Sequence, residues 1–185
     1  MRIRDRLLLA AEEQFAVRGV LAATLAEIRE AAGASVGALY HHFPDKAELY
    51  RQVWLGALAD FQAGFRQAVL ASTDARGGVT AGVRAHLDWV TAHPARATVL
   101  FGAAPAGARE QEGNREFLLD IVRWWRTHAG YGAVRELEFD LLYALWLGPA
   151  QEYARSWLAG AVRRPPAEVA DELAAAAWRT LQNPD

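Results

Sequence analysis

The chain has 185 residues, of which 52% are hydrophobic and 23% are charged, and its formal net charge at pH 7 is −2. This length and composition suit one compact domain, or a small domain joined to a larger one. A chain of this size can bury a hydrophobic core without disulfide or other covalent cross-links. Because the chain has no cysteine, a disulfide scaffold, a thiol nucleophile, an iron–sulfur cluster and a thiolate zinc site are excluded. The small net charge argues against a protein that coats nucleic acid by charge alone.

The sequence carries no sign of a membrane-spanning or secretory segment. Its longest apolar run, residues 141–150, is far shorter than the ~20 residues that a helix needs to cross a bilayer. The basic start of the chain runs into an amphipathic pattern that carries Glu12 and Glu13, unlike a signal peptide. We therefore expect a cytoplasmic protein with no membrane partner.

Apolar residues recur at helical spacing along the chain, and no stretch alternates strictly between apolar and polar residues. This pattern predicts an all-α fold. The first helix is expected from about residue 3 to Gly19, with an inward stripe that includes Leu7, Ala11 and Phe15.

Two short helices are expected next. Thr24 and Glu27 have the spacing of a capping box and open the second helix, which stops at Gly33. Ser35 can cap a third helix of barely two turns, which Pro44 ends.

A second capping box, Asp45 with Glu48, opens a much longer helix that reaches about Leu70. Later helices are predicted at residues 80–91, 95–103, 114–128, 134–161 and 166–181. We expect the helix at 134–161 to kink or break at Pro149, because proline removes a backbone donor and clashes with the preceding turn.

The segment 24–49 reads as a helix-turn-helix, in which two short helices are joined by a tight turn that contains glycine. Several residues of the short second helix of this motif have no obvious core to enter: Ser35, Val36, Gly37, Tyr40, His41 and His42. A tyrosine hydroxyl, imidazoles and the Lys46 ammonium suit phosphate oxygens, and the start of the helix after Thr24 offers free N–H groups. The alternative is that Tyr40 only covers the small core with its ring.

The pattern Ala-Gly-x-Ser-x-Gly-x-Leu-Tyr-x-His-Phe-x-x-Lys, from Ala32 to Lys46, resembles the signature of the TetR family of transcriptional regulators. The resemblance implies a three-helix DNA-binding domain at residues 1–47 and an effector-binding and dimerisation domain at 48–185. It also implies DNA contacts. Thr24 would anchor a phosphate, Ser35, Val36 and Gly37 would face base edges, and Tyr40, His41, His42 and Lys46 would hold the DNA backbone.

Two residues depart from the family's pattern. Val36 stands where a polar or basic side chain is frequent, and Ala38 stands where threonine is frequent. Both departures remove hydrogen bonding to bases. We therefore expect base readout to depend on apolar contact with thymine methyl groups, on arms such as Arg2 and Arg4, and on DNA shape.

The remainder, residues 50–185, contains all seven tryptophans. In the family this part encloses a pocket for a small effector, and such pockets are mostly apolar. Our candidates for its lining are Trp89, Phe101, Trp124, Tyr143 and Trp146, with His86 or Gln151 as polar contacts. The alternative is that these aromatic side chains form core, although the neighbours Trp124 and Trp125 cannot both face one core from a single helix.

The last two helices are expected to form the dimer interface that the resemblance implies. Their apolar stripes comprise Leu141, Leu145, Trp157, Leu158, Val169, Leu173, Ala177 and Leu181. Burial of these side chains within one subunit is the alternative.

The sequence thus predicts a ligand-responsive transcriptional regulator, a repressor that binds a pseudo-palindromic duplex operator as a homodimer. A small apolar or aromatic effector is expected to release it by displacing the helix at 45–70. No cofactor or metal is expected, because the adjacent residues His41 and His42 cannot chelate one ion. No catalytic motif was found, so an enzyme built on a helical bundle is the weaker alternative, and an interaction module that has lost DNA binding is the other.

Overall fold

The computed structural model describes residues 1–108 and 111–184, and within these ranges the regular secondary structure is helical, with one isolated bridge between Val134 and Gln182. The all-α prediction is confirmed. The chain forms two compact units, Met1–Ala59 with Pro94–Glu110 and Asp60–His93 with Gln111–Asp185. This division differs from the expected boundary after residue 47, because the first turns of the fourth helix and a later segment pack with the N-terminal helices. No helix in the described ranges is long and apolar enough to cross a membrane.

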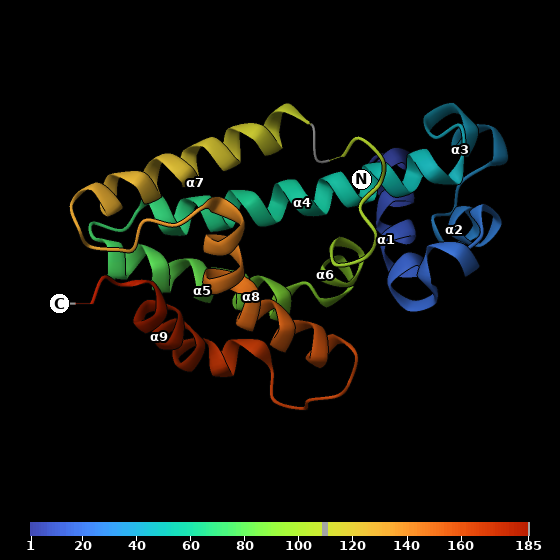
Figure 1. Ribbon diagram of the computed structural model, residues 1–185. Helices are drawn as coiled ribbons and strands as arrows, with labels where there is room; N and C mark the ends of the chain where they lie inside the picture. Colours follow the sequence, from blue (N-terminus) through green and yellow to red (C-terminus); the bar gives the residue numbers. More distant parts are fainter. Residues whose placement is uncertain (109–110, 185) are drawn as a thin grey trace. The chain divides into compact units, whose positions relative to one another are not determined.

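The first unit contains α1 (Ile3–Ala22), α2 (Leu25–Ala31), α3 (Val36–His42), the start of α4 (Lys46–Leu70) and α6 (Pro94–Leu100). Figure 1 shows α1, α2 and α3 gathered around the beginning of α4. The end expected for the first helix at Gly19 is a break rather than a terminus. Gly19 has φ +77°, and helical residues continue beyond it to Ala22.

The caps of the short helices follow the sequence signals. Thr24 and Glu27 form the complete capping box that was predicted for α2. The Ser35 hydroxyl caps α3 by accepting a hydrogen bond from the Ala38 N–H at 3.1 Å. Between these helices Gly33 has φ +59°, a left-handed conformation that glycine adopts without the steric cost of a side chain.

The start of α4 uses half of its predicted capping box. The Asp45 carboxylate accepts a hydrogen bond from the Glu48 N–H at 2.8 Å. The Glu48 carboxylate accepts hydrogen bonds from Arg51 and Gln52 one turn further along. The Arg51 bond is the main reason why the pKa of Glu48 is lowered from its ordinary value.

The core of the first unit is built from one apolar face of each helix. The largest side chains fully buried in it are Leu7, Ile28, Leu39, Phe43 and Leu49. The segment after α5 closes this core, because the Tyr50 hydroxyl donates a hydrogen bond to the Ala103 carbonyl at 2.8 Å. An ion pair between Arg96 and Glu12 at 2.9 Å joins α6 to α1.

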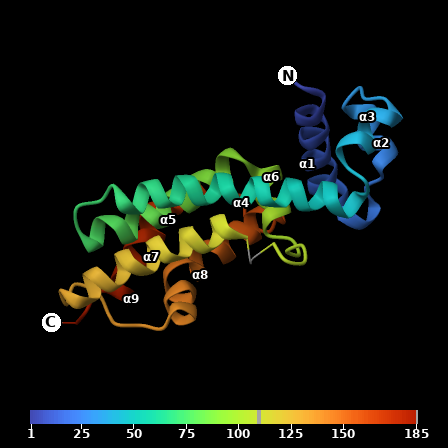
Figure 2. The same ribbon diagram turned by 90° about the horizontal axis from the view of Figure 1, so that it is seen from above.

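The second unit contains the rest of α4, α5 (Ala75–Ala92), α7 (Glu112–Gly130), α8 (Phe139–Leu158), the 3-10 turn η1 (Pro166–Val169) and α9 (Ala170–Leu181). In both ribbon views α7 runs alongside the second half of α4 (Figures 1 and 2), where Gln62 donates a hydrogen bond to Asn114 at 2.7 Å. Helix α9 packs against α5 and α8.

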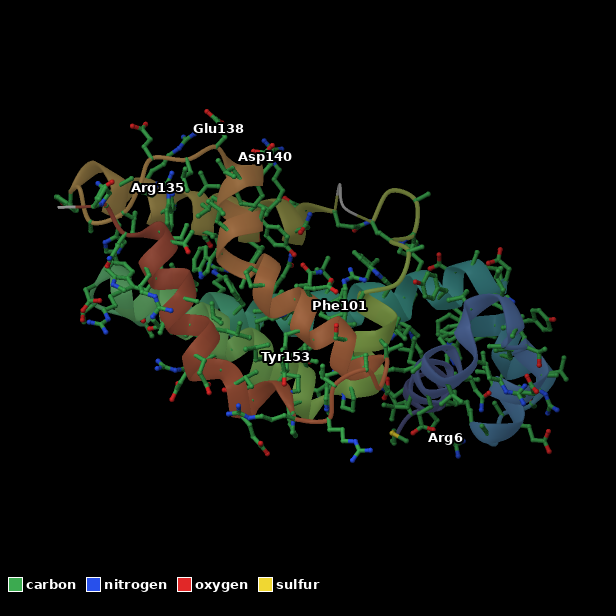
Figure 3. All side chains as sticks on the ribbon, turned by 60° about the horizontal axis from the view of Figure 1, so that its bottom comes forward. Arg6, Phe101, Arg135, Glu138, Asp140 and Tyr153 are labelled. Carbon is green, nitrogen blue, oxygen red and sulfur yellow. The ribbon has the colours of Figure 1, made fainter. Side chains whose placement is uncertain are left out.

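Helix α8 differs from its prediction at its start. Residues 134–138 do not join it, because Val134 pairs with Gln182 and the Arg135 N–H donates a hydrogen bond to the Leu181 carbonyl at 2.9 Å. Figure 3 shows Glu138 and Asp140 pointing outward where this segment enters the helix. No break occurs at Pro149, through which α8 continues.

Aromatic rings fill the interior of the second unit, and two glycines of α5 make room for them. A Cβ at Gly78 would lie 2.1 Å from Cζ2 of Trp124, and one at Gly82 would lie 3.0 Å from Phe65 and from Trp146. The rings of Phe65 and Trp146 are 5.5 Å apart, and the Trp146 indole N–H donates a hydrogen bond to the Val79 carbonyl at 3.0 Å. Helix α5 therefore packs against aromatic side chains through its backbone.

The burial of His86 makes the free energy of unfolding depend on pH. It is buried edge-on to Phe61 at 5.5 Å, and burial lowers the pKa of its imidazole from 6.5 to about 4. Between these pH values the unfolded chain binds a proton that the folded chain does not. The free energy of unfolding therefore falls by about 3 kcal/mol as the pH drops through this window.

We expect His86→Phe to lose that part of the pH dependence, because phenylalanine takes up no proton. Denaturant titrations at pH 7, 5.5 and 4 measure it. The control is His93→Phe, which changes an exposed histidine at the end of the same helix and should leave the slope unchanged. Equal slopes for the wild type and both variants would show that His86 is not held neutral by burial.

Candidate nucleic-acid interface

Helix α3 exposes one face while its other face is held in the core of the first unit. Leu39 is 2% exposed and Phe43 at its end is 1% exposed, whereas Val36 is 58% and Tyr40 is 54% exposed. Gly37 lies between these two on the exposed side. The helix therefore presents an isopropyl group, a bare stretch of backbone and a phenol ring to the surroundings.

Thr24 begins α2 within a tight polar network. Its hydroxyl donates a hydrogen bond to the Glu27 carboxylate at 2.7 Å and accepts one from the Glu27 N–H at 3.3 Å. The Arg18 guanidinium pairs with the other oxygen of that carboxylate. These interactions lower the pKa of Glu27, and the hydrogen bond from the Thr24 hydroxyl has the largest effect. Thr24 is exposed, but its hydroxyl proton is already donated to Glu27.

The Lys46 ammonium makes hydrogen bonds to the protein backbone that the sequence did not predict. Its ammonium donates hydrogen bonds to the backbone carbonyls of Leu21 at 3.0 Å and Ala23 at 3.1 Å. It thereby ties the start of α4 to the end of α1. An ammonium has three donors, so one N–H remains for an anion. The expected phosphate contact of Lys46 stays a prediction beside this role in joining the two helices.

His41 and His42 end α3 and differ in their exposure. His41 is exposed, and His42 is half-buried beside Phe43, with 6.3 Å between the two ring centroids. The two imidazoles meet edge to face at 5.0 Å. In the part of the chain that the structure describes, no group of three or more histidine, aspartate or glutamate residues could hold a metal ion.

The arginines that were expected to reach DNA are engaged by the protein. Arg4 lies over the Phe43 ring at 5.9 Å and donates a hydrogen bond to Gln52 at 3.2 Å. Arg2 pairs with Asp5 at 3.3 Å. Both pairs are exposed, and exposed contacts of this kind are weak enough to be exchanged for a phosphate.

The predicted pocket residues are divided between the two units. Phe101 follows α6 directly (Figure 3) and belongs to the first unit, so it does not join the others within one unit. Trp89, Trp124 and Trp146 belong to the second unit, in which Trp146 is buried and the other two are half-buried. Tyr143 is 44% exposed at the surface.

The polar contacts expected for the pocket have different partners. The Tyr143 hydroxyl donates a hydrogen bond at 2.9 Å to the side chain of Gln151, which lies eight residues further along α8. His86 is buried beside Phe61. Trp89 donates its indole N–H to Asp60 at 2.9 Å.

The aromatic cluster of the second unit also includes Trp125 and Phe117, which were not among the predicted pocket residues. Trp124 and Trp125 both join it, at 5.8 and 5.7 Å from Trp146, with Trp124 stacked at 27°. Phe117 lies 5.9 Å from Phe65. Trp125 is 3% exposed, and its indole N–H has no hydrogen-bond acceptor in the described part of the chain. The expectation that the neighbours Trp124 and Trp125 cannot both face one core was wrong, because both rings of α7 contact Trp146.

A separate groove of about 680 Å³ lies between α5 and α9. Its lining includes Arg76, Arg84, Trp178 and Arg179, and Arg84 pairs across it with Asp171 at 2.7 Å. None of the five predicted pocket residues lines this groove.

The predicted dimer residues fall into two groups. Leu141 is exposed, and Leu145, Trp157, Leu158 and Leu173 are half-buried, so each offers some surface to a partner. Val169, Ala177 and Leu181 are buried within the second unit, because α9 turns that face toward α5 and α8. These three residues are therefore removed from the expected interface.

The N-terminal part of the chain is similar in sequence to known regulatory proteins. A family model described as bacterial regulatory proteins, tetR family, matches residues 7–53. The chain is 41% identical over 87 residues, 47% of its length, to the HTH-type transcriptional activator FasR of Mycolicibacterium smegmatis, of which the match covers 40%. It is 38% identical over 73 residues, 40% of its length, to the HTH-type transcriptional repressor KstR2 of Rhodococcus jostii, of which the match covers 36%. These matches span less than half of either relative.

Solved structures resemble the chain over its whole length. A bacterial regulatory protein in the tetR family from Rhodococcus RHA1 has a TM-score of 0.82 at 20% identity, with 100% of both chains covered. The ketosteroid transcriptional regulator KstR2 of Mycobacterium tuberculosis has a TM-score of 0.73 at 22% identity, covering 98% of this chain and 95% of that one. The sequence likeness to the tetR family model thus lies in the region around the exposed α3, and the solved structures share the fold of the chain over its whole length.

Proposed function

We propose that the protein is a DNA-binding transcriptional regulator whose α3 enters the major groove of duplex DNA. The observation that carries the proposal is the exposed face of α3, on which Val36, Gly37 and Tyr40 stand outward from a helix anchored by Leu39 and Phe43. A helix-turn-helix reads DNA through such a helix, held rigidly at one side. Action on the chromosome would place the protein in the cytoplasm.

The phosphate contacts of this proposal come from the rim of α3. The Tyr40 hydroxyl and the exposed His41 imidazole stand on its second turn, and the remaining N–H of Lys46 lies at the start of α4. His42 would be a lesser contact because it is half-buried, and the Thr24 hydroxyl would donate to a phosphate only by giving up its bond to Glu27.

A homodimer would place two copies of α3 on one face of the duplex. Its proposed interface uses the residues of α8 and α9 that remain accessible: Leu141, Leu145, Trp157, Leu158 and Leu173. Successive major grooves are ~34–36 Å apart on one face, so the operator would be a pseudo-palindrome with half-sites about one helical turn apart. We propose repression as the outcome, in line with the name of the relative KstR2.

Selection from a pool of random duplexes tests the DNA-binding proposal. We expect an enriched inverted repeat, with half-site centres about 10 base pairs apart. Tyr40→Phe should weaken binding to it by about tenfold or more, because each subunit loses a hydrogen bond to a charged phosphate. Tyr131→Phe changes an 83% exposed tyrosine of the second unit and is the matched control, with unchanged affinity. Failure to enrich any sequence would favour an interaction module that has lost DNA binding.

The effector proposed for the second unit is an uncharged, flat aromatic compound. Within the described residues, Gln62 and His86 are the buried polar side chains, and burial keeps His86 neutral at pH 7 by lowering its pKa to about 4. A charged ligand would lose its hydration in this interior and gain no partner of opposite charge. The aromatic cluster offers stacking surfaces, and the unused Trp125 N–H offers a donor for one acceptor on the ligand.

The half-buried Trp124 indicates how such a compound would enter. Its indole occupies a slot between the Cα of Gly78 and the stacked Trp146 ring. A flat ligand could take this place if Trp124 swings outward. The ligand would change DNA affinity only through a difference in affinity for two arrangements of the protein. Helix α4 could carry that change, because its residues belong to both compact units.

Trp124→Ala tests this slot by leaving a vacancy of the shape of an indole. We expect free indole at millimolar concentration to raise the melting temperature of Trp124→Ala by a few degrees, since a ligand that binds only the folded state stabilises it. Trp178→Ala, which shortens a half-buried tryptophan in the groove between α5 and α9, is the control. An equal effect of indole on both variants would contradict a specific aromatic slot.

A further inference from the structure

The polar side chains around the first turn of α3 bind the protein's own backbone. The Ser35 hydroxyl accepts from the Ala38 N–H at 3.1 Å, and the Arg29 guanidinium donates to the Ala34 carbonyl at 3.1 Å, across the turn between α2 and α3. Both bonds hold the turn and the helix start in place. The Ser35 O–H and the other Arg29 N–H groups still have donors to offer, but these bonds hold both side chains against the turn.

The outward surface of that turn is apolar. Val36 is 58% exposed, and Gly37 beside it carries no side chain. A Cβ at Gly37 would meet no described atom of the protein within 4 Å, so the backbone of α3 is open to close approach from outside. The polar atoms of the exposed face, the Tyr40 hydroxyl and the His41 imidazole, belong to the second turn of the helix.

Base edges in the major groove differ in what they offer to such a surface. Guanine, adenine and cytosine present hydrogen-bond donors or acceptors there, and thymine alone adds a methyl group. An isopropyl group that covers a donor or acceptor removes water from it and replaces no bond. Against a thymine methyl the same isopropyl group buries apolar surface on both sides.

Resting on the proposed DNA-binding function, we propose that Val36 is a specificity-determining residue that reads the methyl group of one thymine in each half-site. Gly37 lets the helix backbone come close enough for this contact. Sequence preference at the base pair that faces the first turn of α3 then arises from apolar contact and not from hydrogen bonding. The operator carries a thymine at that position in both half-sites.

Replacement of thymine by deoxyuridine tests the contact, because it removes the methyl group and leaves the base-pairing atoms unchanged. Each thymine of the selected duplex is replaced in turn, symmetrically in both half-sites, and the dissociation constant is measured for the wild type and for Val36→Ala. We expect one thymine whose loss of methyl weakens wild-type binding about fourfold for each half-site, or about fifteenfold for both. The same replacement should leave the affinity of Val36→Ala unchanged.

Two further variants serve as comparisons for Val36→Ala. Val17→Ala shortens an 84% exposed valine of α1 and should keep the full deoxyuridine effect. Gly37→Ala, which has room inside the protein for its Cβ, should keep or raise the melting temperature and weaken binding to every duplex. Circular dichroism of each variant confirms that it is folded.

The outcomes separate this inference from the proposed function. If no duplex is enriched or bound, the DNA-binding proposal fails. If the duplex is bound but every deoxyuridine replacement leaves wild-type affinity unchanged, the thymine contact is overturned while DNA binding stands. If a deoxyuridine effect persists at full size in Val36→Ala, another side chain reads the methyl group and the assignment to Val36 is overturned.

Discussion

A helix of two turns can bury only one of its faces, and this constraint on α3 determines what the first unit offers to other molecules. Leu39 and Phe43 occupy the buried face, together with Ile28 and Leu49 from the neighbouring helices. The remaining positions, Val36 and Tyr40 above all, are then forced outward. The polar groups that fix this arrangement act on the helix ends, where Ser35 caps α3 and the Lys46 ammonium holds the end of α1.

Much of the first unit could be predicted from local signals in the sequence. The capping box at Thr24, the left-handed turn at Gly33 and the apolar stripe of Leu7, Ala11 and Phe15 are decided within a few residues of the chain. The role of Lys46 is different, because its ammonium binds a carbonyl 25 positions away. Only the folded structure brings these groups together, so the residue pattern suggested a free cation where the structure has an engaged one.

The second unit was less predictable because its order depends on packing between distant helices. Residues 134–138 have helical periodicity but pair with the chain after α9, so α8 begins at Phe139. In α5, Gly78 and Gly82 look like weak helix positions in the sequence. The rings that cover them come from α4, α7 and α8. The division into two compact units also follows contacts between distant segments, since residues 94–108 group with the first unit.

The central claim is that the outward face of α3 touches DNA, and cross-linking from that face tests it most directly. A photoreactive benzoylphenylalanine in place of Tyr40 should form a covalent adduct with the selected duplex on irradiation. The same residue in place of Leu119, which is 52% exposed on α7, should form none. Adducts from position 119 but not from position 40 would contradict the account, because the exposed face of α3 would then lie away from the DNA.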